Sequence, residues 1–418
     1  MLATLRRILL AASLSTVALA SAAQAAVTVE FWHSFDGSSG KALEQIIGKF
    51  EAAHPDIKID AQDIGDYNAI VAKLQAAIPA HRAPDAVIME VTRYGLFADR
   101  GVLKDLTPYL DADPLKGQLF DYAREAGIYK GKNYIIPFNS STPVLYLNTK
   151  LLKEAGIDTV PELKTWDEIL KVAQTVTDKL GSQGITGIAA PGQFARWGLV
   201  EDNDSELIDP RTNDILLDAP GTIAAYQWMA DLVHKYHVAS PDGVTNEAQG
   251  EAEFTAGKVA MMLNSVGDYG GVRQAVGPDL TVVPMPCNKV CRVPIGGAGI
   301  GIVAASDKAK QDAAWTFISY MASADANATW FAATGYMPIN KNTAAVPVAA
   351  DALKTQPALQ VSIDQLPFAV GRPRPVVVTW MRAKEYTMWQ AMALGQRDVT
   401  EAMKDFATQT RAEAAKSN

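Results

Sequence analysis

The sequence has few of the features that mark proteins that bind nucleic acids or span membranes. The chain of 418 residues carries a formal net charge of -8, and its lysines and arginines form no cluster. An acidic chain without a basic cluster is a poor partner for nucleic acid or for an anionic membrane surface. Beyond residue 25, no apolar run reaches the length of about 18 residues that a membrane-spanning helix needs. We therefore expect neither a nucleic-acid partner nor a membrane-spanning segment.

Motifs for catalysis and for cofactor binding are also missing. The chain has no P-loop and no G-x-S-x-G nucleophile elbow. The glycines at 296–301 are superficially similar to a dinucleotide-binding loop, but the letters "IVAA" that follow predict a strand where that loop needs a helix. His234 and His237 have no carboxylate at matching spacing, so we interpret them as part of a solvated helix face. We expect no cofactor and no metal.

Cysteine is scarce, and its two positions lie close together. Cys287 and Cys291 stand on a proline-flanked stretch, "PMPCNKVCRVP". In an oxidising compartment such a pair favours a small local disulfide, with free thiols as the alternative. A metal site would need further ligands, and no histidine is near. The pair is expected to staple a loop and not to take part in chemistry.

The first 25 residues have the pattern of a cleaved signal peptide. Arg6 and Arg7 precede an apolar stretch at 8–20, and "AQA" at 23–25 supplies a small-x-small cleavage site. We expect a mature chain that begins at Ala26 and is located in the periplasm. About 390 residues remain, which is long for one core and comfortable for two domains.

The first part of the mature chain alternates between strand and helix patterns. The predicted elements are a strand at 27–31, a helix around 43–50, a strand at 57–59, a helix at 67–78 and a strand at 86–89. This alternation predicts an α/β protein with a mostly parallel sheet. Ligands of such sheets lie beyond the carboxyl ends of the strands, which directs attention to 33–40 and 90–95.

A second α/β unit is expected after Asn148. Thr165 and Glu168 form a capping box in front of an apolar helix stripe. A strand at 259–263 follows the turn at Gly257, and Ser306 is expected to cap the next helix. The chain from Ala383 onward has a helical pattern.

The stretch "PFNSSTPVLYLN" at 137–148 places four small polar residues in front of an apolar strand. Asn, Ser and Pro are common turn residues, so one interpretation is an ordinary loop. The other is a binding rim, where small donors meet a polar ligand. The pattern leaves both open.

Six motifs then occur in one order across almost the whole mature chain: "FWHSFDG", "FNSSTPVLYLN", "TWDEIL", "FTAGKVAMM", "IGGAG" and "TGYMPIN". Together they resemble the extracellular solute-binding proteins of ABC importers. "TWDEIL" and "FTAGKVAMM" mark only the broad sugar-binding class. "FWHS", "PFNSSTPVLY" and the late "GRPRP" are more similar to the glycerol-3-phosphate-binding branch of that family.

The resemblance implies a two-lobed type II periplasmic binding fold that closes on its ligand. The implied N-terminal lobe comprises 26–138 and 297–341, and the C-terminal lobe comprises 141–291 and 345–418. A small-molecule ligand would lie between the lobes, and the partners would be the subunits of an inner-membrane ABC permease. We expect a monomer without catalytic residues.

The resemblance also implies a set of ligand contacts, which fall on Tyr67, Glu90, Ser141, Trp197, Ser265, Gly297, Tyr336 and Arg374. Donors from serine and tyrosine hydroxyls, a backbone N–H at Gly297 and the Arg374 guanidinium suit a phosphate. Glu90 suits glycerol hydroxyls. The paired tryptophans of that family correspond here to Phe194 and Trp197, and the phenylalanine departs from the pattern.

Three hypotheses of function follow, two of them binding proteins with different ligands and the third an enzyme. The first is sn-glycerol 3-phosphate or a glycerophosphodiester such as glycerophosphocholine. The second is the same fold with an oligosaccharide or another sugar, because aromatic rings and carboxylates serve sugars equally well. The third is a secreted glycoside or phosphodiester hydrolase that pairs Glu90 with Asp36 or Glu201.

Overall fold

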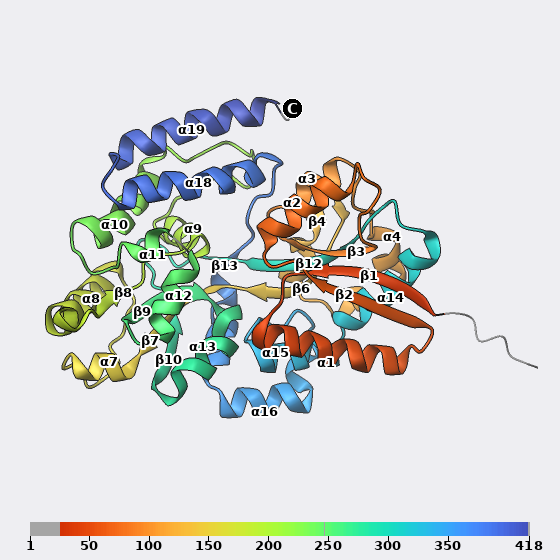
Figure 1. The fold of residues 1–418 in the computed structure, drawn as a ribbon, viewed down its shortest axis with the longest axis horizontal. Helices are drawn as coiled ribbons and strands as arrows, with labels where there is room; N and C mark the ends of the chain where they lie inside the picture. The colour runs from red at the N-terminus through yellow and green to blue at the C-terminus, as the bar shows by residue number, and fades with distance from the viewer. Residues whose placement is uncertain (1–25, 246, 417–418) are drawn as a thin grey trace, which may run out of the picture.

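The computed structural model describes residues 26–245 and 247–416, and the predicted signal peptide at 1–25 lies outside these residues. The described chain is built around two separate larger sheets, one on each side of the molecule (Figure 1). The strand orders are β2-β1-β3-β12-β6 and β10-β7-β9-β8. A two-stranded sheet of β11 and β13 and another of β4 and β5 accompany them.

The first sheet is parallel on one side and antiparallel on the other. Its strands are β1 (Val27–His33), β2 (Ile57–Asp63), β3 (Ala86–Glu90), β6 (Ile136–Ser141) and β12 (Gly296–Ile302). β1 pairs in parallel with β2 and β3, whereas β12 runs antiparallel to both β3 and β6. The prediction of a mostly parallel sheet therefore holds for the first three strands, and the late strand β12 changes the pattern.

Helices cover this sheet because they present apolar stripes to it. α1 (Gly37–Ala53) buries Leu43, Ile46 and Phe50, and the Phe50 ring meets the edge of Phe317 in α14 with ring centroids 5.2 Å apart. The other helices of this part are α2 (Tyr67–Ala77), α3 (Tyr94–Asp99), α4 (Thr107–Ala112), α5 (Leu115–Gln118), α6 (Asp121–Ala126), α14 (Lys308–Met321) and α15 (Ala324–Thr334). The short strands β4 (Ile128–Tyr129) and β5 (Lys132–Asn133) follow α6.

The second sheet is mainly antiparallel. Its strands are β7 (Pro143–Asn148), β8 (Thr186–Ile188), β9 (Val259–Ser265) and β10 (Leu280–Pro284). β7 runs antiparallel to β9 and β10, and only β8 pairs in parallel with β9. Its helices are α7 (Thr149–Glu154), α8 (Trp166–Leu180), α9 (Gln193–Asp202), α10 (Pro220–His234), α11 (Asp242–Thr245), α12 (Glu247–Thr255), α13 (Tyr269–Val276), α18 (Val377–Ala393) and α19 (Val399–Lys416).

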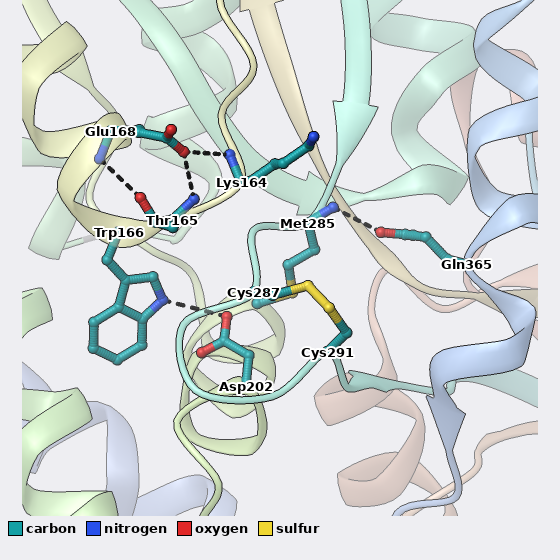
Figure 2. The surroundings of a disulfide bond; sticks show 9 residues. All are labelled: Lys164, Thr165, Trp166, Glu168, Asp202, Met285, Cys287, Cys291 and Gln365. Carbon is teal, nitrogen blue, oxygen red and sulfur yellow. Dashed lines mark hydrogen bonds between the residues drawn. A yellow bond between two sulfur atoms is a disulfide. The ribbon is translucent and has the colours of Figure 1, made fainter.

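α8 starts at the predicted capping box. The Thr165 hydroxyl accepts a hydrogen bond from the Glu168 N–H at 3.3 Å, and the Glu168 carboxylate accepts one from the Thr165 N–H at 2.9 Å (Figure 2). The predicted apolar stripe of this helix is buried. Two other helix predictions are wrong. Asp307 and not Ser306 precedes α14, since the Ser306 hydroxyl donates to Asp85, and His237 lies beyond the end of α10 at a φ of +53°.

A third apolar cluster joins the two sheets. Val144 and Tyr146 of β7 pack with Phe331 of α15, Met337 and Leu359, all buried. The helices α16 (Pro347–Thr355) and α17 (Ala358–Asp364) belong to this region. The two halves are thus packed together and not only tethered.

The chain passes between the sheets over very short segments. β6 ends at Ser141 in the first sheet and β7 begins at Pro143 in the second, so that Thr142 alone lies between them. On the return, β11 (Val293–Pro294) pairs in parallel with β13 (Ala369–Val370) immediately before β12. The predicted boundaries of the two lobes stay a prediction.

The two cysteines form a disulfide, which confirms the local staple (Figure 2). The loop that it closes is bonded to the end of α9: the backbone N–H groups of Lys289 and Val290 donate to the Asp202 carbonyl at 2.9 and 3.0 Å. Trp166 donates to the Asp202 carboxyl at 3.3 Å. The described residues contain no group of His, Cys, Asp and Glu side chains that could hold a metal, and none of their helices is long and apolar enough to cross a membrane.

Candidate functional site

Three of the predicted contact residues come together where β3, β6 and β12 end or begin. In the registers of these strands Ala298 lies opposite Glu90, Gly296 opposite Ser141 and Gly297 opposite Ser140. This edge of the first sheet is also the place where the chain passes into the second sheet. Strand pairing therefore collects residues that are up to about two hundred positions apart in the sequence.

Gly297 is required by its close packing. Its φ is +93°, and a Cβ at this position would lie 1.6 Å from the Asn139 carbonyl oxygen. Its own carbonyl accepts from the Val91 N–H at 3.0 Å. A side chain at this position would be strained in the backbone and would also separate β12 from β6.

Tyr67 and Tyr336 meet at Asn139. The Asn139 amide donates to the Tyr67 hydroxyl at 2.9 Å, and both groups are within hydrogen-bonding reach of Tyr336. Burial raises the pKa of Tyr67 to about 12 and that of Tyr336 well above its ordinary value. The Tyr336 ring stacks on Trp330, with ring centroids 5.7 Å apart. Both hydroxyls are therefore neutral donors and acceptors.

Ser265 ends β9 beside this tyrosine pair. Its hydroxyl accepts from the Gly267 N–H at 3.0 Å, and its carbonyl accepts from the Tyr146 hydroxyl at 2.7 Å. A Cβ on Gly267 would lie 2.3 Å from the Tyr336 ring, so the two segments are in direct contact. Ser265 of the second sheet thus lies beside the tyrosine pair, which packs against the core of the first sheet.

Three carboxyl groups, Asp36, Glu251 and Asp268, face one another near these residues, and we call them the acidic group. Burial, together with the charges of Glu251 and Asp36, raises the pKa of Asp268 to about 8. Burial and Asp36 also raise the pKa of Glu251, which accepts from the Asn264 amide at 3.2 Å. Asp36 directly precedes α1, whereas the other two belong to the second half of the molecule.

Glu90 is surrounded by three arginines, and we call Glu90, Arg93, Arg372 and Arg382 the Glu90 cluster. The Glu90 carboxylate lies 2.7 Å from Arg372, 2.8 Å from Arg382 and 3.5 Å from Arg93. Burial acts to raise the pKa of Glu90, but the guanidinium groups of Arg382, Arg372 and Arg93 outweigh it and hold the pKa at about 2. The carboxylate is therefore ionised and already paired.

The two aromatic residues of the predicted site pack on this cluster. The Arg372 guanidinium lies 5.0 Å from the Phe194 ring centroid and 5.1 Å from that of Trp197. Trp197 is buried in the apolar core of the second half. A Cβ on Gly296 would lie 2.5 Å from the Phe194 ring and 2.8 Å from the Ser141 hydroxyl. Phe194, Ser141 and the glycine strand therefore meet.

The structure does not bring Arg374 to the other predicted residues. One terminal nitrogen of its guanidinium lies within hydrogen-bonding distance of the Tyr94 hydroxyl at 2.8 Å and of the carbonyls of Glu125, Ala126 and Ile128 at 2.8 to 3.0 Å. Its side chain thus fastens the "GRPRP" segment to the end of α6. Arg372, two residues earlier, is the arginine of this motif that lies beside Glu90 and Phe194, where Phe194 also meets Ser141.

Arg93, Arg372 and Arg382 were not among the predicted contacts. Arg372 stands in the same "GRPRP" motif as the predicted contact Arg374. The assignment of ligand contacts within this motif stays a prediction. Arg382 lies in α18, which follows this motif. Arg93 lies just beyond the end of β3, in the stretch 90–95 where the strand pattern directs attention. A rule that examines every cation beyond a strand end would have found Arg93.

Comparison with known proteins gives a family. The bacterial extracellular solute-binding proteins match residues 45–360. The sn-glycerol-3-phosphate-binding periplasmic protein UgpB of Escherichia coli K12 is 28% identical over 348 residues, which cover 78% of this chain and 77% of that protein.

Solved structures show the same fold. UgpB of Mycobacterium tuberculosis, in complex with glycerophosphocholine, superposes with a TM-score of 0.84 at 24% identity over 92% of this chain and 98% of that one. The substrate-binding protein Lmo0181 of Listeria monocytogenes, in complex with cycloalternan, gives 0.85 at 23% identity over 93% and 99%. The chain therefore belongs to the bacterial extracellular solute-binding proteins, has their two-lobed α/β fold, and binds a small molecule for an ABC permease.

Proposed function

We propose that this protein is the periplasmic component of an uptake system for sn-glycerol 3-phosphate or a glycerophosphodiester such as glycerophosphocholine. The observation that carries the proposal is the Glu90 cluster, where three guanidinium groups surround one carboxylate at the junction of the two halves. Guanidinium groups suit phosphate because their planar donors match its oxygens. The relation to UgpB, whose name specifies glycerol 3-phosphate, supports the same ligand class.

The neutral part of the ligand would meet the hydroxyl groups beside this cluster. We propose contacts from Tyr67, Ser141, Ser265 and Tyr336, and from the backbone at Gly297. Tyrosine and serine hydroxyls both donate and accept, which suits glycerol hydroxyls as well as phosphate oxygens. Glu90 and Trp197 act on the arginines and not on the ligand directly, because the carboxylate is paired and one ring face of the tryptophan is covered by Arg372.

Binding requires no covalent step. A ligand that contacts residues of both halves stabilises their closed arrangement, and the short crossings at Thr142 and between β11 and β12 leave few places for the motion between them. The closed protein would deliver its ligand to the permease, with ATP hydrolysis on other chains. Export through a cleaved signal peptide at 1–25 belongs to the same proposal.

The two rival hypotheses fit less well. A neutral oligosaccharide, as bound by the Listeria protein, needs no excess of buried positive charge. A hydrolase built on Glu90 needs this carboxylate open to its substrate, whereas guanidinium groups of three arginines already contact its two oxygens.

A thermal-unfolding panel tests the ligand class. Ligand that binds only the folded protein should stabilise it by about 2.7 kcal/mol at a hundredfold excess over Kd. We expect a rise in Tm with sn-glycerol 3-phosphate or glycerophosphocholine and none with maltose or maltotriose, and no consumption of ligand. Stabilisation by the sugars alone would overturn the proposal, and turnover would favour the hydrolase.

A further inference from the structure

We propose that Arg372 and Arg382, oriented by Glu90, bind the anionic group of the ligand. The inference deepens the proposed function and rests on its premise that the ligand carries a phosphate. It assigns the anion contact to two arginines other than Arg374, and it gives Glu90 a positioning role in place of a ligand contact.

Arg372 is a buried cation, and one terminal nitrogen of its guanidinium is available to a ligand. It is 4% exposed, its Nε donates to the Ile295 carbonyl at 2.9 Å, and one terminal nitrogen donates to Glu90 at 2.7 Å. The other terminal nitrogen, Nη1, is buried and has no hydrogen-bond partner among the described residues. A buried charged donor without an acceptor is costly, so a ligand oxygen at this position would be stabilising.

Arg382 is held in a fixed direction from the opposite side. Its Nε donates to the Gln193 amide oxygen at 2.6 Å, and one terminal nitrogen donates to Thr92 at 3.1 Å and lies 2.8 Å from Glu90. The same Glu90 oxygen, Oε1, therefore contacts both guanidinium groups. One carboxylate thus sets the spacing of the two cations, and removing it should release both.

The charges of the two arginines leave a surplus that suits an anion. Arg372 and Arg382 contribute two positive charges and share one carboxylate oxygen of Glu90, so one negative charge faces two guanidinium groups. A phosphate oxygen beside Nη1 of Arg372 would add negative charge where this nitrogen has no hydrogen-bond partner among the described residues.

Arg374 provides the contrast inside the same motif. Its Nη1 lies within hydrogen-bonding distance of one hydroxyl and three carbonyls at the end of α6, so it is anchored there and not at Glu90. We therefore expect its loss to lower the thermal stability of the protein and to leave ligand affinity unchanged.

The experiment is calorimetry on the full mature protein with sn-glycerol 3-phosphate, glycerophosphocholine and glucose 6-phosphate. The variants are Arg382→Gln, Arg372→Lys, Arg374→Gln and, as a control on the exposed connection after α18, Arg397→Gln. We expect wild type to bind at least one of the two glycerol phosphates. Arg382→Gln and Arg372→Lys should each weaken the monoester by about 10- to 100-fold. The affinity for glycerophosphocholine should fall as well, because its phosphate oxygens would meet the same two guanidinium groups.

The positioning role of Glu90 has its own readout. Glu90→Gln should weaken glycerol 3-phosphate and glucose 6-phosphate by similar factors, because both depend on the oriented arginines. A contact between Glu90 and glycerol hydroxyls predicts instead that only the glycerol ligand weakens, and this result would overturn the role.

The failures are distinguishable. Unchanged monoester binding in both Arg382→Gln and Arg372→Lys overturns the inference and leaves the proposed function standing, and so does loss of binding in Arg374→Gln alone. Wild-type binding of glucose 6-phosphate without glycerol 3-phosphate overturns the proposed function and leaves the arginine assignment to be decided by the same variants. Arg382 is partly exposed, so its variant remains informative if Arg372→Lys fails to fold.

Discussion

The Glu90 cluster and the acidic group lie at the same junction and shift their carboxyl groups in opposite directions. Burial acts to raise the pKa of Glu90 and of Asp268 alike. Three arginines reverse the effect at Glu90 and hold its pKa at about 2, whereas Glu251 and Asp36 add to the effect at Asp268 and take its pKa to about 8. Depth of burial therefore does not decide the charge of a site, and the neighbouring charges do.

The comparison also separates local from net charge. The chain as a whole is acidic, with a formal charge of -8, yet one end of the junction holds a surplus of positive charge. A ligand that contacts both regions would meet cations at one end and carboxyl groups at the other. The net charge of the chain therefore does not describe the local charge at this junction.

The largest expected effect comes from breaking the basic region. Glu90→Gln leaves three guanidinium groups without their carboxylate, and loss of one partner of a buried ion pair costs about 3–5 kcal/mol of unfolding free energy. Because the pKa of Glu90 is lowered, its contribution is present above the unfolded value of 4.5 and is lost as pH falls through about 2.

Urea unfolding of wild type and of Glu90→Gln between pH 3 and pH 7 measures this effect. The difference between the two proteins should be largest at pH 7 and should shrink toward pH 3. Glu162→Gln, whose side chain is 78% exposed, is the control. Equal stability at pH 7 would contradict the ion-pair assignment.

A smaller effect of opposite sign is expected in the acidic group. The folded pKa of Asp268 is raised, so its favourable contribution is complete below the unfolded value of 3.8 and is lost as pH rises through about 8. Asp268→Asn removes this loss and should stabilise the protein by about 2 kcal/mol at pH 8, after allowance for solvent screening. Thermal unfolding from pH 5 to pH 9 should give a flatter profile than wild type. The exposed Asp351→Asn serves as its control, and a profile parallel to wild type speaks against the raised pKa.

The smallest effect concerns the coupling of the two regions through the ligand. Asp36→Asn removes one negative charge from the acidic group without touching the arginines. Affinity for glycerol 3-phosphate should rise by about 2- to 5-fold at low ionic strength and less at 0.5 M salt, because exposed charges are screened. Calorimetry at the two salt concentrations is the measurement, with Asp56→Asn as the control. A gain that does not respond to salt would point to a change in packing.

Local patterns predicted the elements well because each signal lies within a few residues. The capping box of α8, the strand at 86–89 and the disulfide pair depend on neighbours in sequence, and all three are present. The sheet topology depends on β12, which inserts between β3 and β6 from the far end of the chain, and no local pattern carries that information. Local patterns also carry no information on strand direction in the second sheet, where β7 pairs with the much later strands β9 and β10.

The site was harder to predict than the fold because it depends on which partner each side chain finds. One proline separates Arg372 from Arg374 in the sequence. Their partners differ because the carbonyls at the end of α6 lie within hydrogen-bonding distance of Arg374 only. Glu90 was correctly placed at the end of a strand. Of its three arginines, Arg93 lies close by in the sequence, whereas Arg372 and Arg382 come from the far end of the chain. The sequence therefore predicted the type and position of these residues, but it did not predict which side chains pair with one another.

The place of β12 has a consequence for how the chain can fold. A chain that emerges amino-terminus first, from a ribosome or across a membrane, presents β3 and β6 long before the strand that belongs between them. Until residues 296–302 arrive, the first sheet has a gap in its centre and two strands with unpaired edges. Every strand of the second sheet is available earlier. The sheet that begins first is therefore expected to be completed last, and during that interval its unpaired strand edges are the part of the chain most in need of a chaperone.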